Sequence, residues 1–311
     1  MNETELALLK RLLYLRSYID FDFLLEKRSV DLVAVSKYYK IANPFFYRLF
    51  CSWRGFMHIG LSNNGVYRRE YGYENSQLIN IAQYIDNNEN LKIVELGCGQ
   101  CAGLKYLAQQ RPAVSFIGVD LVPSPLGKIA QNMVTIQADY HRLDFLVDSS
   151  VDGFYAIETL CYSDKKEMLF RQLYEKLKPG GFVAIYDGYT CKGAKSYSQI
   201  ETLCLEILSR AYHVPEFEYI NDVESAIRIA GFSIDYSLNL KGQAMPFFNE
   251  IGSRVEKYCR LGPLLRLALK IMPQDLKGSM IPGYLLCELM QANLVSYQFH
   301  LLKKKEENNA L

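Results

Sequence analysis

Short β-branched and aromatic runs alternate with amphipathic stretches from residue 91 onward. Compact apolar runs predict strands, whereas apolar residues recurring every three or four positions predict helices. Strands are predicted at seven ranges: 91–96, 115–120, 133–138, 151–157, 181–187, 232–238 and 294–302. Strands that alternate with helices are typical of crossover connections. The pattern therefore predicts an α/β fold, a Rossmann-like seven-stranded, mostly parallel sheet with helices on both faces.

The hydrophobic pattern also divides the chain. Residues 1–80 are predicted to form a helical cap, and residues 81–303 the main domain. A connection of more than fifty residues separates the last two strands, and connections of that length are usually functional, so a helical lid insert is expected at about 241–293. The charged tail, 304–311, is predicted to be solvated.

The segment 262–272, GPLLRLALKIM, has two interpretations. An amphipathic helix of this kind is more often packed on its own domain. An apolar segment with two cations is also suited to lie on a membrane surface. The pattern favours a packed lid helix, with membrane contact as the alternative.

Composition narrows the classes of partner. The 311 residues contain 35 basic and 34 acidic side chains, a net charge of +1, which argues against nucleic acid. The N-terminus lacks the basic start and uninterrupted apolar centre of a secretory signal, and no run suits a membrane span. We expect a soluble, cytoplasmic protein with a small apolar or amphipathic substrate. Whether it forms a homo-oligomer is left open.

Eight cysteines occur without the spacing of a disulfide framework. Cys98 and Cys101 form a C-x-x-C pair, but a second pair with matching spacing is missing. Zinc sites usually need four such ligands. No metal site is predicted.

Candidate ligand contacts stand at three strand ends. Glu95 leads into a glycine turn with Gly97 and Gly99, which lets backbone approach a ligand closely, and a predicted helix follows. Asp120 ends the next strand, where a carboxylate can accept both ribose hydroxyls of a nucleoside. Asp139 follows the third strand and can accept a hydrogen bond from an adenine amino group.

These residues carry a resemblance. The stretches ELGCGQCAG (95–103), GVD (118–120), AD (138–139) and LKPGG (177–181) resemble class I S-adenosylmethionine-dependent methyltransferases. An NAD-binding domain fits less well, because the third glycine falls one residue later than in the dinucleotide fingerprint. The resemblance implies S-adenosylmethionine as cofactor. The predicted cofactor-binding residues are Glu95, Leu96, Gly97, Cys98, Gly99, Gly103, Asp120, Leu121, Ala138, Asp139, Tyr140 and Glu158.

A narrower resemblance begins at the fourth strand. Ile157-Glu158, Cys161 and Tyr162 are similar to the sterol C-methyltransferase branch, which has a histidine where Tyr162 stands. That branch implies C-methylation of an isoprenoid or lipid-like alkene through a carbocation. The predicted catalytic residues are Glu158, as base or cation-steering group, Tyr162, and His58, which falls in a segment resembling the substrate gate of the family.

Aromatic content supports this interpretation, because aromatic faces stabilise cations. The chain has 23 Tyr and 16 Phe. Those expected near the pocket are Tyr67, Tyr71, Tyr73, Tyr155, Tyr162, Tyr186, Tyr189, Phe247 and Phe248. Arg68 and Arg69 would suit a diphosphate substrate, although solvated loop charges are the commoner case.

Two other classes of function stay open. One is an O- or N-methyltransferase of a small natural product in secondary metabolism, where positioning alone could suffice because the sulfonium is already activated. The other is a cofactor-binding protein that transfers no methyl group.

Overall fold

The computed structural model describes residues 1–25, 33, 35–40, 58–67, 76–88, 90–123, 127–272, 277–278 and 280–306. One sheet of eight strands runs through the molecule, in the order β3-β4-β2-β1-β5-β6-β8-β7. The strands are β1 (Lys92–Leu96), β2 (Ser115–Asp120), β3 (Gly127–Ala130), β4 (Met133–Gln137), β5 (Val151–Ile157), β6 (Leu177–Thr190), β7 (Ser233–Asn239) and β8 (Val295–Lys303).

The central strands of this sheet are parallel. β4, β2, β1, β5 and β6 run in one direction, whereas β8 is antiparallel to β6, β7 to β8, and β3 to β4. From β1 the chain winds first toward β4, and then resumes at β5 on the other side of β1. Crevices at such a reversal of strand order, beyond the carboxyl ends, are where open α/β sheets bind ligands.

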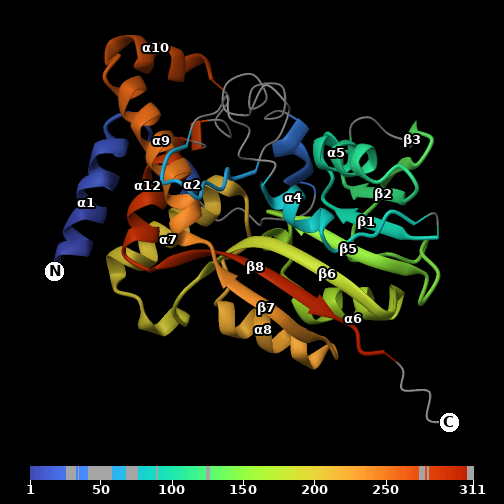
Figure 1. Cartoon of the computed structure of the whole chain (residues 1–311). Coiled ribbons are helices and arrows are strands. Elements are labelled where there is room, and N and C mark those ends of the chain that lie inside the picture. Colours follow the sequence, from blue (N-terminus) through green and yellow to red (C-terminus); the bar gives the residue numbers. More distant parts are fainter. Residues whose placement is uncertain are drawn as a thin grey trace.

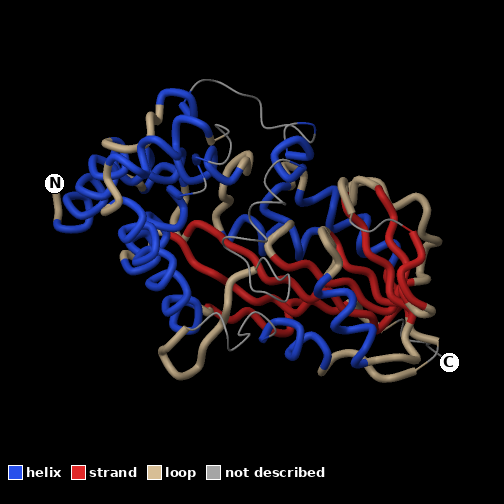
Figure 2. The backbone as a smooth tube through the Cα atoms, turned by 90° about the horizontal axis from the view of Figure 1, so that it is seen from above, coloured by secondary structure: helices blue, strands red, loops and turns tan. Residues whose placement is uncertain are grey.

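Helices cover both faces of the sheet (Figures 1 and 2). In Figure 1, α4 and α5 lie above the sheet, and α6 and α8 lie below it. A further group of helices stands at the β8 end, with α9 and α12 contacting β8. The described helices are α1 (Glu3–Arg16), α2 (Asp22–Leu25), α4 (Ser76–Ala82), α5 (Ala102–Gln110), α6 (Lys166–Lys176), α7 (Gln199–Tyr212), α8 (Ile220–Ile229), α9 (Lys241–Cys259), α10 (Pro263–Ile271) and α12 (Met280–Gln291).

Local sequence explains several helix ends. Asn2 with Glu5 and Ser198 with Glu201 form capping boxes that start α1 and α7, each pair satisfying two backbone N–H groups that lack helical partners. α12, by contrast, is apolar almost all round. Nearly all of its side chains are buried, as expected for a helix enclosed by other elements.

The Rossmann-like, mostly parallel fold is confirmed, with one additional strand. β3 is a four-residue edge strand, and alternating half-exposed and exposed residues make it too short and too polar to stand out in the hydrophobic pattern. Three helices, α9, α10 and α12, occupy the range of the expected lid insert. Arg68, Arg69, Tyr71 and Tyr73 lie outside the described residues, as does the tail from 307 onward.

The described helices include none that combines the length and apolar character needed to cross a membrane.

The packing between β5 and β6 generates a stability prediction. A Cβ on Gly153 would collide with the Phe182 ring on the neighbouring strand, so Gly153→Ala forces that ring or the backbone to shift. Overpacking of a filled core costs about 1–3 kcal/mol of unfolding free energy, measurable by urea denaturation. Gly193→Ala is the control, because a Cβ there meets no atom within 4 Å. Equal stability of both variants would contradict the packing described.

Candidate active site

A cavity of about 360 Å³ lies at the carboxyl ends of β1, β2, β5 and β6. Its described walls also include the helical residues 35–40, the segment at 58–59, and side chains from α7, α9, α12 and β8. The cavity therefore sits where the strand order reverses, and elements distant in sequence close it on the side of the helical group.

The structure brings most of the predicted residues to this cavity. Those lining it are Glu95, Gly97, Cys98, Gly99, Gly103, Asp120, Leu121, Asp139, Tyr140, Glu158, Tyr162 and His58. Leu96 and Ala138 do not line it. Leu96 is fully buried in the apolar cluster on one side of the sheet, and Ala138 packs against that cluster.

The glycine turn is shaped by close contacts. Gly97 has φ +72° and a Cβ there would collide with the Thr159 side chain, so only glycine fits without strain. Gly97 and Cys98 donate backbone N–H groups to the Val119 carbonyl at 2.7 and 3.2 Å, which ties the turn to β2. The backbone of residues 97–99 is thereby held against the cavity, which it lines.

Asp120 is fixed in place by backbone donors. Gly99 N–H donates to Oδ2 at 2.8 Å and Val122 N–H to Oδ1 at 2.7 Å. Burial raises the pKa of this carboxyl group. Each oxygen retains a second lone pair, so Asp120 can still accept the two hydroxyls of a ribose.

Asp139 is oriented by a histidine that lies behind the cavity wall. Its Oδ1 accepts the backbone N–H of His141 at 2.9 Å and lies 2.7 Å from His141 Nδ1. The other ring nitrogen, Nε2, is 2.7 Å from Ser163 Oγ. Two groups of His141 thus fix Asp139 just after β4, in the place expected for a contact to adenine, and Ser163 holds the histidine ring.

The buried carboxyl group of Glu95 indicates which charge of ligand the cavity favours. Its Oε2 is buried and has no hydrogen-bond partner among the described residues. Burial raises the pKa of this carboxyl group well above its usual range. Gly103 lies against it, where a Cβ would stand only 3.0 Å from Oε1. A cation bound beside this carboxyl group would favour its ionised form, so the site suits a cationic ligand.

The cavity as a whole is also lined by acidic side chains. Five of its lining side chains are acidic, Glu95, Asp120, Asp139, Glu158 and Asp187, while no Lys or Arg is found among the described lining residues. S-adenosylmethionine carries a sulfonium and an ammonium group against one carboxylate. The acidic wall and the open glycine turn therefore fit this cofactor.

Glu158 lies at the turn after β5 and is held in a fixed orientation. Its φ is +53°, and its backbone N–H donates to the Tyr186 carbonyl at 2.7 Å. Side-chain Oε1 accepts two hydrogen bonds, from Ile59 N–H at 2.7 Å and from the Tyr297 hydroxyl at 2.8 Å. Burial outweighs these bonds and raises the pKa of Glu158 to about 8. The carboxyl can thus exchange a proton near neutral pH.

Tyr162 pairs with another phenol. Its hydroxyl lies 2.6 Å from that of Tyr39, in the helical residues 35–40, and the ring centroids are 5.9 Å apart. Burial raises the pKa of Tyr162 well above its usual range, so both groups stay neutral. Neutral phenols can donate hydrogen bonds and present ring faces to a cation.

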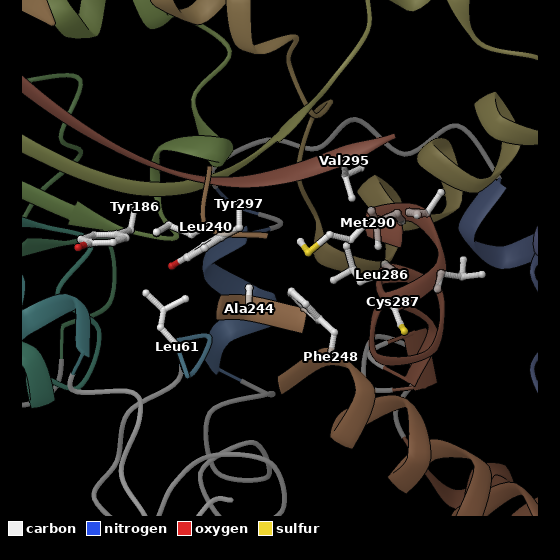
Figure 3. Close-up of a cluster of buried hydrophobic side chains, with 14 of the residues drawn as sticks. Leu61, Tyr186, Leu240, Ala244, Phe248, Leu286, Cys287, Met290, Val295 and Tyr297 are labelled. Atoms are coloured by element: carbon white, nitrogen blue, oxygen red, sulfur yellow. The ribbon is translucent and has the colours of Figure 1, made fainter. Parts of the chain in front are cut away.

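The rest of the cavity is apolar and aromatic. In Figure 3, Phe248 of α9 and Met290 of α12 extend into the space beside Tyr297 of β8. The apolar and aromatic lining residues from the helical side and β8 are Val35, Tyr38, Tyr39, Tyr212, Val214, Phe217, Phe247, Phe248, Ile251, Val255, Leu286, Met290, Val295 and Tyr297. This part of the wall suits an apolar acceptor.

Part of the expected aromatic set lies elsewhere. Phe247 and Phe248 line the cavity, and Tyr67 packs on Phe247 with centroids 4.9 Å apart. Tyr155, Tyr186 and Tyr189 instead belong to the apolar clusters that pack against the sheet. Both sheet faces are buried, so hydropathy did not reveal which strand residues turn toward the cavity.

Several lining residues were not predicted, above all Tyr297, Tyr39 and Asp187. Asp187 Oδ2 accepts Cys161 N–H at 2.9 Å, and burial raises the pKa of this carboxyl group. Its position in the run GFVAIYD, at the carboxyl end of β6, was a usable signal, because neighbouring parallel strands end at the same edge.

The C-x-x-C pair is buried. Cys98 and Cys101 sulfurs are 3.9 Å apart, and this hydrogen bond together with burial raises the pKa of the Cys98 thiol. The described residues contain no group of three or more His, Cys, Asp or Glu placed to hold a metal ion.

Comparison with known proteins agrees with this geometry. Residues 94–185 match the family model described as a methyltransferase domain. Sterol methyltransferase-like 2 from Botryococcus braunii is 22% identical over 147 residues, 45% of this chain and 38% of the relative. Phosphoethanolamine N-methyltransferase 3 from Arabidopsis thaliana is 26% identical over 155 residues, 48% and 30% of the two chains. The chain thus matches less than half the length of these relatives.

Solved structures extend the likeness to the whole fold. The cyclopropane synthase MmaA2 from Mycobacterium tuberculosis has a TM-score of 0.70 and 13% identity, covering 89% of this chain and 99% of its own. A geranyl diphosphate C-methyltransferase from Streptomyces coelicolor has a TM-score of 0.57 and 11% identity, covering 86% and 98%.

The fold and the glycine turn with its carboxylates resemble those of class I S-adenosylmethionine-dependent methyltransferases, and residues 94–185 match the methyltransferase domain model. Within this class the chain resembles the sterol and isoprenoid branch.

The position of Asp120 predicts a loss of cofactor affinity in Asp120→Asn. Removing a charged acceptor from a buried hydrogen-bonding site costs about 1.5–3 kcal/mol, which is roughly tenfold or more in Kd for S-adenosylmethionine. Isothermal calorimetry measures this change. Asp152→Asn is the matched control, since Asp152 pairs with Lys178 at the opposite end of the strands. A similar Kd for both variants would contradict the assignment of Asp120.

Proton release on cofactor binding is a second prediction. A cation beside Glu158, whose pKa is about 8, and beside Glu95, whose pKa is also raised, favours their ionised forms. Affinity should therefore rise with pH until the free-protein pKa is passed, with release of about one proton at neutral pH. Calorimetry in buffers of different ionisation enthalpy measures this release. Glu95→Gln and Glu158→Gln should each reduce it, whereas proton-neutral binding would refute the effect.

Proposed function

We propose that this protein is a cytosolic enzyme that transfers a methyl group from S-adenosylmethionine to an alkene carbon of an isoprenoid or similar lipid-like molecule. The observation that carries the proposal is the Glu158 carboxyl, poised near neutral pH between the acidic cofactor side of the cavity and its aromatic wall. The sterol methyltransferase relatives and the geranyl diphosphate methyltransferase fold neighbours support it.

When bound, S-adenosylmethionine supplies an electrophilic methyl group on a cationic sulfur. Transfer of that methyl group to an alkene carbon would leave positive charge on the acceptor. Neutral Tyr39 and Tyr162 and the ring of Phe248 can stabilise that charge, each by about 0.5–2 kcal/mol. Ionised Glu158 then takes a proton from the adjacent carbon, which restores a double bond.

Residues remote from the strand ends hold this base in place. Tyr297 and Ile59 both bind Oε1 of Glu158, so Oε2 is the oxygen left to receive a proton. We propose that residues 1–80 gate the acceptor and that the range 241–293 acts as its lid. Tyr38, Tyr39 and His58 from the first range line the same cavity as Phe248 and Met290 from the second.

Methylation of an oxygen or nitrogen is the second candidate. The acidic cavity would attract an amine, and the phosphoethanolamine N-methyltransferase relative supports this class. A phosphate-bearing amine or an isoprenyl diphosphate would be less well served, because the described lining residues offer no Lys or Arg. The position of the new methyl group distinguishes the two candidates.

The deciding experiment offers neutral alkene lipids, phenols and amines with S-adenosylmethionine and detects mass gain. Carbon methylation adds one methylene that resists acid and base hydrolysis. Glu158→Gln should lower turnover by about 10²–10⁴-fold, the usual contribution of a positioned base, while cofactor still binds. Unchanged turnover in this variant would refute the base assignment.

Tyr297→Phe is the companion variant. Loss of its hydroxyl removes a donor that favours the ionised carboxylate, so the pKa of Glu158 should rise above about 8 and the pH profile of turnover should move to higher pH. A merely structural role of Tyr297 would lower turnover at every pH without this shift.

A further inference from the structure

The described surface carries an unusual concentration of exposed apolar side chains at α10. Leu264, Leu267 and Ile271 are 68, 61 and 85% exposed, and Leu261 and Tyr258 before the helix are 51 and 38% exposed. Single exposed apolar residues are normal on protein surfaces, whereas a contiguous group marks an interaction site.

These residues form one stripe, because positions 264, 267 and 271 fall on the same side of a helix. The helix is anchored by its opposite side, where Leu265 and Leu269 are 8 and 4% exposed and pack into the apolar core. The structure thus confirms a packed helix in 262–272, yet the packing uses only one of its two apolar sides.

Positive charge accompanies the stripe. Between residues 257 and 272 the chain carries Lys257, Arg260, Arg266 and Lys270 and no acidic residue. All four cations are exposed. Arg266 also lies over the Tyr18 ring, 5.7 Å from its centroid, which fixes α10 against the end of α1. The segment therefore carries cations beside its apolar stripe.

We propose that α10 and the turn before it dock on a membrane surface that contains anionic phospholipid. An apolar stripe flanked by Lys and Arg, without a spanning segment, is the pattern of helices that lie in the headgroup region. The absence of acidic residues favours anionic lipid over a second copy of this near-neutral chain.

Docking through α10 would bring the apolar part of the cavity close to the membrane. α10 follows α9 after a short turn, and α9 supplies Phe248 and Val255 to the cavity wall. In Figure 1, α10 stands at the outer end of the helical group, away from the sheet. Docking there places the helices that enclose the apolar part of the cavity next to the phase in which lipid-like molecules dissolve.

Vesicle co-sedimentation tests the proposal with the full chain. Phosphatidylcholine vesicles with and without phosphatidylglycerol are the probes, and binding should be strong only with the anionic lipid and should weaken with salt. The triple variant L264S, L267S, I271S should bind at least tenfold more weakly. R260E combined with K270E should remove the preference for anionic lipid.

Controls separate docking from misfolding. Phe145 and Val147 are 41 and 74% exposed on another loop, so F145S with V147S should bind as the wild type does. All variants should keep the thermal transition and the affinity for S-adenosylmethionine, which makes the test independent of the proposed methyl transfer.

Three results would overturn the proposal. One is wild-type protein that stays in the supernatant with both kinds of vesicle, and another is a triple variant that sediments as the wild type does. The third is a dimer in analytical ultracentrifugation that the triple variant dissociates while neither form binds vesicles, which would assign the stripe to self-association.

Discussion

Burial of carboxyl groups at the carboxyl edge of the sheet is the constraint on which the site depends. Glu95, Asp120 and Glu158 are withdrawn from water without a Lys or Arg beside them among the described cavity residues. Their raised pKa values express the cost of this burial. Backbone N–H groups and phenols offset part of that cost, and a cationic ligand offsets more. The same burial thus favours binding of a cationic ligand and sets the pKa of the Glu158 carboxyl.

The sequence could predict this edge of the sheet because the residues that form it follow directly after each strand. Each parallel strand ends in a short polar stretch, so Glu95, Asp120, Asp139 and Glu158 could be assigned to a common edge before their contacts were known. The mostly parallel sheet followed from the same alternation of strands and helices. Only β3, with its short and polar sequence, departed from it.

Other parts of the site depend on contacts that no local pattern encodes. Tyr297 lies 139 residues from Glu158 in sequence and Tyr39 lies 123 from Tyr162, yet both pairs are hydrogen bonded. Tyr155 and Tyr297 pack in the same apolar cluster, but Tyr297 is level with Gly188 near the carboxyl end of β6, whereas Tyr155 is level with Ala184, further from that end. In strands buried on both faces, the apolar pattern does not show which residues reach the cavity.

The hydrogen bond from Ile59 to Glu158 has a mechanical consequence. Ile59 is held in turn by Gln77 of α4 through its carbonyl, at 2.5 Å, and Ser62 donates its N–H to the Gln243 carbonyl of α9 at 2.9 Å. Residues 58–62 therefore link Glu158 to the start of α9. A displacement of this segment would remove one donor from Glu158, which raises its pKa, and would remove a hydrogen bond from α9 at the same time.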